Sequence, residues 1–127
     1  MPRILVVDDE PGIAESIELI LRESEYEVTK SYSGAEALQV AASFLPDVLL
    51  SDVLMPGMNG FELALATKAV LPQCRVLLFS GQATTLSMAL EYSSRFTARG
   101  YHFELLPKPL HPQSLLEKIQ NSLTAAA

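Results

Sequence analysis

Acidic side chains follow two short apolar runs of the sequence. Asp8 and Asp9 come directly after RILVV (3–7), and Asp52 ends the run DVLLSD (47–52). An ionised carboxylate at the end of a buried strand is costly unless something pairs with it. Each acid alone is explained most simply as a turn former or helix cap. Clustered carboxylates also suit a hard divalent cation such as Mg²⁺, which prefers oxygen ligands.

Two further polar residues end apolar runs later in the chain, Ser80 in FSG and Lys108 in PKP. A carboxylate can act as a nucleophile and form an aspartyl phosphate, while a metal and a lysine neutralise charge on the transferred group. Lys108 has a compact ammonium suited to that role, and the Ser80 hydroxyl can donate to a phosphoryl oxygen. A surface lysine or a serine beside a glycine is ordinary by itself. The interpretation as a phosphoryl-transfer site therefore depends on the combination of these residues with the acids.

Parallel strands are the elements that would bring these residues together. Short apolar runs alternate with helical periodicity, which indicates a parallel sheet covered on both faces. Strands are expected at 3–7, 27–31, 47–52, 74–80 and 103–107, and helices at about 12–23, from 33, from 59, at 84–98 and from 112. Five such units predict an α/β, doubly wound sheet whose ligand site lies beyond the carboxyl ends of the strands. The five polar residues should converge there.

Composition supports one domain spanning residues 1–127. A hydrophobic fraction of 49% is enough for a core without disulfides, and the single cysteine, Cys74, allows no intramolecular disulfide. The apolar runs are too short for a signal peptide or membrane span, so a cytoplasmic location is expected. The net charge of -6 argues against nonspecific nucleic-acid binding.

Four motifs together resemble the receiver domain of two-component response regulators. They are ILVVDDEP (4–11), LLSDVLMPGMNG (49–60), VLLFSG (76–81) and LPKP (106–109). Each motif alone is weak, but their order and their strand-terminal positions are specific, and the resemblance covers essentially the whole chain. It implies a (βα)5 flavodoxin-like fold with strand order 2-1-3-4-5.

The resemblance also implies a role for each site residue. Asp52 would be the phosphoacceptor, Ser80 the switch hydroxyl and Lys108 the phosphate-binding lysine, followed by a cis peptide bond to Pro109. Asp9 would bind Mg²⁺ directly and Asp8 through water. Asp52 itself and the backbone carbonyl of Leu54 would complete the protein ligands.

The function implied is a phosphorylation-dependent signalling switch rather than an enzyme with an external substrate. A sensor histidine kinase or phosphotransfer protein would phosphorylate Asp52, and a downstream protein would read the result, with no DNA-binding domain and no membrane involved. A single-domain regulator is favoured, and a receiver that is part of a larger protein is the other arrangement.

Two other classes of protein remain open at this point. One is a pseudo-receiver, which keeps the fold and binds partners without phosphate. The other is a small metal-dependent phosphatase with an aspartyl-phosphate intermediate. Such phosphatases resemble a different pattern, with two aspartates one residue apart, whereas Asp8 and Asp9 are adjacent.

The sequence departs from the receiver pattern in two places. Leu105 stands where receivers usually carry an aromatic residue, and Phe103, the nearest aromatic, should share a face with Leu105 in an ordinary strand. The segment before Lys108 is also longer than typical, which predicts a longer fourth helix or loop around 93–100. Leu54 and Gln82 occupy the positions that tune water access in the family, and apolar Leu54 predicts slow decay of the phosphorylated state.

Overall fold

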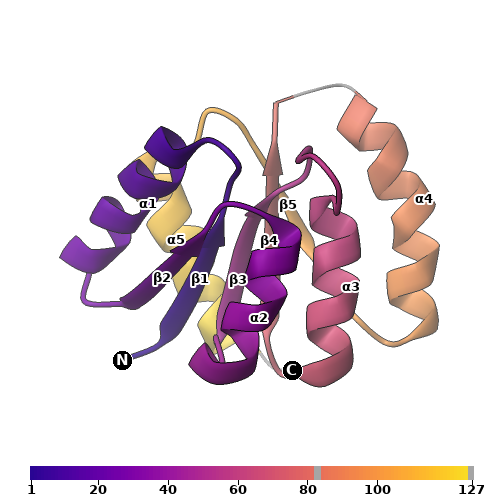
Figure 1. Cartoon of the computed structure of the whole chain (residues 1–127), viewed down its shortest axis with the longest axis horizontal. Helices are drawn as coiled ribbons and strands as arrows, with labels where there is room; N and C mark the ends of the chain where they lie inside the picture. The colour runs from indigo at the N-terminus through magenta and orange to yellow at the C-terminus, as the bar shows by residue number, and fades with distance from the viewer. Residues whose placement is uncertain (82–83, 126–127) are drawn as a thin grey trace.

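The computed structural model describes residues 1–81 and 84–125. Strands and helices alternate along the chain (Figure 1). The strands are β1 (Arg3–Val7), β2 (Glu27–Ser31), β3 (Val48–Asp52), β4 (Arg75–Ser80) and β5 (Glu104–Pro107), and the helices are α1 (Pro11–Glu23), α2 (Gly34–Phe44), α3 (Gly60–Val70), α4 (Thr84–Ala98) and α5 (Pro112–Thr124). Three strands begin one residue later than expected and α1 begins one residue earlier, which is ordinary variation at element ends.

The five strands form one parallel sheet in the order β2-β1-β3-β4-β5, which confirms the predicted fold. Figure 1 shows α2 and α3 in front of the sheet, α1 and α5 behind it, and α4 beyond α3 at the right-hand edge. The strand order reverses between β1 and β3, so the carboxyl ends of these two strands flank the switch point where doubly wound sheets bind ligands. Asp8 and Asp52 lie at those two ends.

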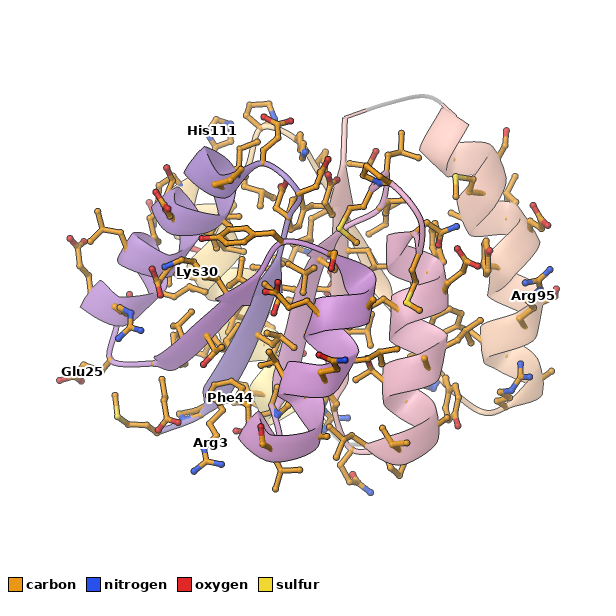
Figure 2. All side chains as sticks on the ribbon, viewed as in Figure 1. Arg3, Glu25, Lys30, Phe44, Arg95 and His111 are labelled. Carbon is orange, nitrogen blue, oxygen red and sulfur yellow. The ribbon has the colours of Figure 1, made fainter. Side chains whose placement is uncertain are left out.

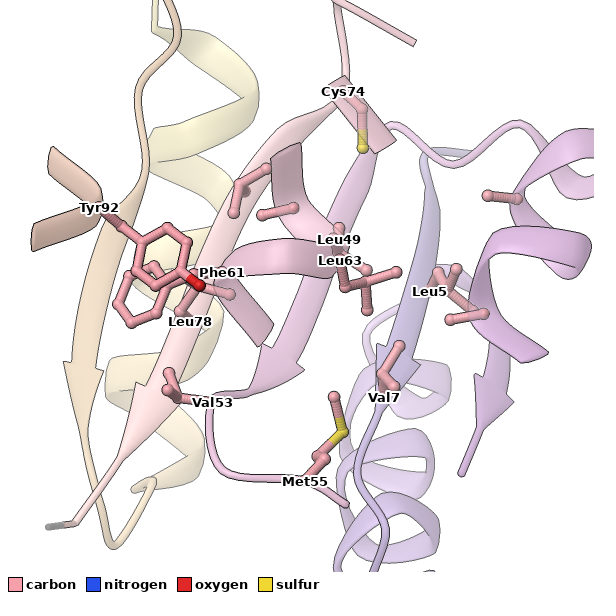
Figure 3. Packing of buried hydrophobic residues seen from close by; sticks show 14 of the residues in the cluster. Leu5, Val7, Leu49, Val53, Met55, Phe61, Leu63, Cys74, Leu78 and Tyr92 are labelled. Atoms are coloured by element: carbon pink, nitrogen blue, oxygen red, sulfur yellow. The ribbon is translucent and has the colours of Figure 1, made fainter. Parts of the chain in front are cut away.

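Alternating side chains of the strands point to opposite faces of the sheet, and each face carries one hydrophobic layer. Leu5 and Leu49 face the layer under α2, α3 and α4, whereas Ile4 and Leu50 face the layer under α1 and α5. Charged side chains such as Glu25 and Arg95 project from the outer surface (Figure 2), and Figure 3 shows the first layer from close by. Because every residue of β3 is buried, the acid at its end is placed within the protein rather than on its surface.

The starts of α2 and α3 are held by the capping side chains expected from the sequence. At α3 the Asn59 side chain accepts from the Glu62 N–H at 2.9 Å, and the Glu62 carboxylate accepts from the Asn59 N–H at 3.0 Å, a complete capping box. At α2 Ser33 accepts from the Glu36 N–H at 3.2 Å. Gly100 follows α4 with a φ of 71°, a conformation that favours glycine.

Two glycines allow the loop between β3 and α3 to pack closely. A Cβ at Gly60 would collide with the carbonyl oxygen of Asp52, and one at Gly34 would lie 2.9 Å from Cβ and Sδ of Met58. The loop that follows Asp52 is therefore held against the start of α3 at one end and the start of α2 at the other. None of the helices within residues 1–81 and 84–125 is both long and apolar enough to span a membrane.

Candidate functional site

The carboxyl ends of four strands meet around a pocket of about 280 Å³. The residues that line it are Asp9, Glu10, Asp52, Leu54, Ser80, Gly81 and Lys108. Asp8 lies beside it, because carboxylate oxygens of Asp8, Asp9 and Asp52 all fall within 4.8 Å of one another. The structure thus brings together all six residues that the sequence nominated for the site.

Asp8 is the most deeply placed of the three acids, with no exposed surface. Its Oδ1 accepts from the Glu10 N–H at 2.9 Å, but Oδ2 has no hydrogen-bond partner among the described residues. Burial raises the pKa of Asp8 to about 6, and the neighbouring Asp52 and Asp9 charges act in the same direction. A buried carboxylate oxygen without a partner, next to two other carboxylates, fits a hard divalent cation such as Mg²⁺.

Asp52 has the partner that an acid at the end of a buried strand requires. The residue is 6% exposed, its Oδ1 accepts from the Val53 N–H at 2.9 Å, and the same oxygen lies 3.4 Å from the Lys108 Nζ. Burial raises the pKa of Asp52, and the positive charge of Lys108 opposes that rise without cancelling it. Both contacts fall on Oδ1, so together they fix the orientation of the carboxylate.

Lys108 reaches this position because the segment after β5 is tied to β4. Its backbone N–H donates to the Ser80 carbonyl at 3.2 Å, and its Nζ lies 5.2 Å from the centroid of the Phe79 ring. The peptide bond between Lys108 and Pro109 is cis, as the resemblance implied. The side chain is only 28% exposed, so the lysine does not behave as a freely solvated surface residue.

Ser80, at the end of β4, and Leu54, in the loop after the neighbouring strand β3, line the same pocket. Ser80 ends β4 and lies opposite Pro107 in the strand register. The side chain of Leu54 packs against the hydrophobic layer under α3. Gln82, the other position expected to tune water access, falls outside the described residues, so slow decay of a phosphorylated state stays a prediction.

An aromatic cluster that was not predicted from the sequence joins α3, α4 and the segment before β5. The Phe61 and Tyr92 rings stack with centroids 4.9 Å apart (Figure 3), and Phe103 contacts Phe61 edge-on at 5.3 Å and Phe96 at 4.7 Å. The Tyr92 hydroxyl also accepts from the Asn59 side-chain amide at 3.4 Å. The spacing of Tyr92 and Phe96, four residues apart in a predicted helix, was the available signal for a buried aromatic face.

Phe103 and Leu105 pack against the same hydrophobic layer, as strand alternation predicted. Phe103 itself lies one residue before β5, and its ring contacts are made to α3 and α4. It therefore takes part in joining these helices. The segment before Lys108, which was expected to be long, contains α4. With 15 residues, α4 is the longest helix in the described part of the chain.

Comparison with known proteins identifies the class that this fold and site define. The sequence model of the response regulator receiver domain matches residues 4–120, and the chain belongs to that family. Receiver domains are signalling switches of two-component systems, they are generally not classical enzymes, and they typically bind Mg²⁺ at an acidic pocket.

Individual relatives agree with this assignment. A CheY-like receiver domain protein from Methanospirillum hungatei JF-1 superposes with a TM-score of 0.83 at 31% identity, covering 97% of this chain and 94% of that one. The chemotaxis protein CheY4 of Vibrio cholerae gives 0.82 at 31% identity, covering 97% and 99%.

Among curated relatives, the DNA-binding response regulator MtrA of Mycolicibacterium smegmatis is 27% identical over 121 residues. That match covers 95% of this chain and 50% of the relative, so the chain spans about half the length of this protein.

Proposed function

We propose that this chain is a phosphorylation-dependent switch in which Asp52 accepts a phosphoryl group from a histidine kinase or phosphotransfer protein. The observation that carries the proposal is the Asp52 carboxylate, which is buried, oriented through Oδ1 and placed between the Lys108 ammonium and two other acids. Asp8, Asp9, Asp52 and the Leu54 carbonyl would hold Mg²⁺. A downstream protein would read the phosphorylated surface, and a cytoplasmic location, typical of the family, belongs to the same proposal.

The proposed transfer uses groups already in place. A carboxylate oxygen of Asp52 forms the new bond to phosphorus, the bond from phosphorus to the donor histidine nitrogen breaks, and its electron pair leaves with the imidazole. The Lys108 ammonium, 3.4 Å from Oδ1, stabilises negative charge on the phosphoryl oxygens, and the Ser80 hydroxyl would donate to one of them. A bound Mg²⁺ would supply further positive charge beside the same oxygens.

Ionisation of Asp52 is required before it can act as a nucleophile. Burial raises its pKa, whereas the Lys108 charge lowers it. A cation beside Asp8 and Asp9 would act in the same direction as Lys108, because an opposite charge nearby favours the charged form. The acidic cluster therefore supports the reaction only together with positive charge.

A phosphorylation-independent pseudo-receiver is the alternative. The observation in its favour is Leu105, which leaves the usual aromatic position on β5 without a ring. The presence of Asp8, Asp9, Asp52 and Lys108 around one pocket weighs against it, because a pure binding module has no need of that set.

Beryllium fluoride with Mg²⁺ gives a direct test, because it occupies the place of a phosphoryl group on a carboxylate. In amide NMR spectra we expect shifts around Asp52, Ser80 and Lys108 in the wild type and none in Asp52→Asn. Absence of shifts in the wild type, or equal shifts in the variant, would favour the pseudo-receiver.

A further inference from the structure

A second pocket, of about 400 Å³, lies at the opposite edge of the sheet from Asp52. It is formed where β4 begins at Arg75, where His102 and Phe103 lead into β5, and where α3 and α5 end. The pocket shares no lining residue with the candidate phosphorylation site.

Lys68 of α3 brings a buried positive charge to this pocket. The residue is 7% exposed, its Nζ donates to the Pro72 carbonyl at 3.0 Å, and it lies 5.7 Å from the centroid of the Tyr101 ring. Burial lowers its pKa. Within residues 1–81 and 84–125 no carboxylate lies within 4.0 Å of Nζ, and the Pro72 carbonyl uses only one of the three N–H donors of an ammonium.

Arg75 provides a second positive charge without an acidic partner in the described part of the chain. Its guanidinium donates to the Ala125 carbonyl at 2.8 Å. Glu104 is the acid that lines the pocket, but its carboxylate is already paired with Lys118 at 2.7 Å. The charge left for an occupant of the pocket is therefore positive.

This concentration of unpaired charge is unusual within the chain. Six of its nine lysines and arginines form ion pairs with acids, namely Arg3, Arg22, Lys30, Arg95, Lys108 and Lys118. Among the described residues, Lys68, Arg75 and Arg99 remain, and two of these three line one pocket. In a protein with a net charge of -6, acids to pair with them are plentiful, yet the acid that lines this pocket, Glu104, is paired with Lys118 instead.

We propose that this pocket binds the oxyanion group of a small molecule, a phosphate or a carboxylate, through Arg75 and Lys68. A guanidinium matches two oxygens of such a group at once, and an ammonium adds a compact charge. His102, Asn121 and Ser122 add further hydrogen-bonding groups, and Phe103 provides an apolar wall for the rest of the molecule. The proposal does not depend on phosphorylation of Asp52.

The two histidines of the chain allow a direct test. His102 lines the pocket, whereas His111 precedes α5 and lies at the top of Figure 2, at the other edge of the sheet. Imidazole NMR signals would be followed during titration with inorganic phosphate and, separately, with acetate, without Mg²⁺ and at constant ionic strength and pH. We expect a saturable shift of the His102 signals while those of His111 stay in place, and the tighter of the two anions identifies the preferred group.

Matched arginine variants separate the pocket from general attraction to positive charge. Arg75→Gln should weaken binding about tenfold or more, because it removes a charged donor pair, whereas Arg99→Gln should leave it unchanged. Lys68→Met, which keeps an apolar stem in the buried position, should weaken binding as well. A shift that does not saturate, that appears equally at both histidines, or that has the same dissociation constant in Arg75→Gln as in the wild type would overturn the proposal.

Discussion

Gly60 lies directly against the backbone of Asp52. Its N–H donates to the Val53 carbonyl at 2.9 Å, and a side chain at this position would collide with the Asp52 carbonyl oxygen. Gly12, at the start of α1, has no atom within 4 Å of the position that a Cβ would occupy. The two glycines therefore provide a pair in which the same substitution meets very different surroundings.

Gly60→Ala should destabilise the fold by about 2–4 kcal/mol, because the backbone after Asp52 must shift to admit a methyl group. Gly12→Ala should change the free energy of unfolding by less than about 1 kcal/mol, in the stabilising direction. Urea denaturation of both variants measures the difference. Equal effects at the two positions would contradict the close approach at Gly60.

At the level of elements, aromatic contacts join α4 to α3 and to Phe103. Tyr92 stacks on Phe61, and its hydroxyl accepts a hydrogen bond from Asn59, the residue that caps α3. Because Gly60 is pressed against the Asp52 backbone, these contacts form a continuous connection from Asp52 to α4. The outer face of α4 exposes Leu86 and Leu90.

Tyr92→Phe keeps the ring but removes the hydroxyl that Asn59 contacts. We expect beryllium fluoride to shift amide signals near Asp52 as in the wild type, while the shifts at Leu86 and Leu90 fall to about half or less. Tyr26→Phe, between α1 and β2, serves as the control. Unchanged shifts on α4 in Tyr92→Phe would show that the change at Asp52 reaches α4 without the Tyr92–Asn59 hydrogen bond.

A different kind of contact joins α1 to β2. Glu18 accepts from Lys30 at 2.7 Å and from Arg22 at 3.2 Å, and the Lys30 hydrogen bond is the main reason that the pKa of Glu18 is lowered. A carboxyl group whose pKa is lower in the folded state than in the unfolded state adds stability above the unfolded value. That contribution is lost as the pH falls through the folded value.

Glu18→Gln should therefore lower the thermal midpoint at pH 7 and lose this effect as the pH falls through the lowered pKa of the wild-type carboxyl, below which that carboxyl is protonated as well. Glu23→Gln on the same helix, whose side chain makes no ion pair in the described part of the chain, should behave like the wild type throughout. A deficit of Glu18→Gln that is independent of pH would point to packing rather than charge.

For the molecule as a whole, charge is divided between the two edges of the sheet. Three acids and Lys108 meet at the carboxyl ends of the strands, and Lys68 and Arg75 meet at the opposite edge. The acidic edge stores repulsion that a bound cation would relieve. Stability should consequently depend on divalent cations, since any ligand that binds only the folded state stabilises it.

Mg²⁺ at ten times its dissociation constant should add about 1.4 kcal/mol to the free energy of unfolding. Asp8→Asn should be at least as stable as the wild type without the metal, because the substitution removes a buried charge, but should gain little from Mg²⁺. Glu117→Gln, a surface change on α5, should respond like the wild type. Thermal unfolding with and without Mg²⁺ measures each response, and equal stabilisation of all three proteins would argue against a metal at Asp8.

Sequence reasoning reached the fold because hydrophobic period and helix caps are local properties. The spacing of Asn59 and Glu62 predicted the start of α3. The position of Asp8, Asp52 and Lys108 at strand ends was enough to predict that they meet. The stacking of Tyr92 on Phe61 joins residues 31 positions apart on two helices, so no local pattern could specify it. The close approach of Gly60 to Asp52 could not be predicted either, because a glycine next to a helix start has several ordinary explanations.

Met58 makes the tight loop after Asp52 sensitive to oxidation. Its sulfur packs against the start of α2 so closely that even a methyl group on Gly34 would lie 2.9 Å from it. Oxidation to the sulfoxide would add a polar oxygen atom to that contact, where space is lacking and an apolar surface is required. Peroxide exposure should therefore loosen the loop beside Asp52 without altering any acid of the site, and reducing storage conditions matter for this protein although its single cysteine is buried.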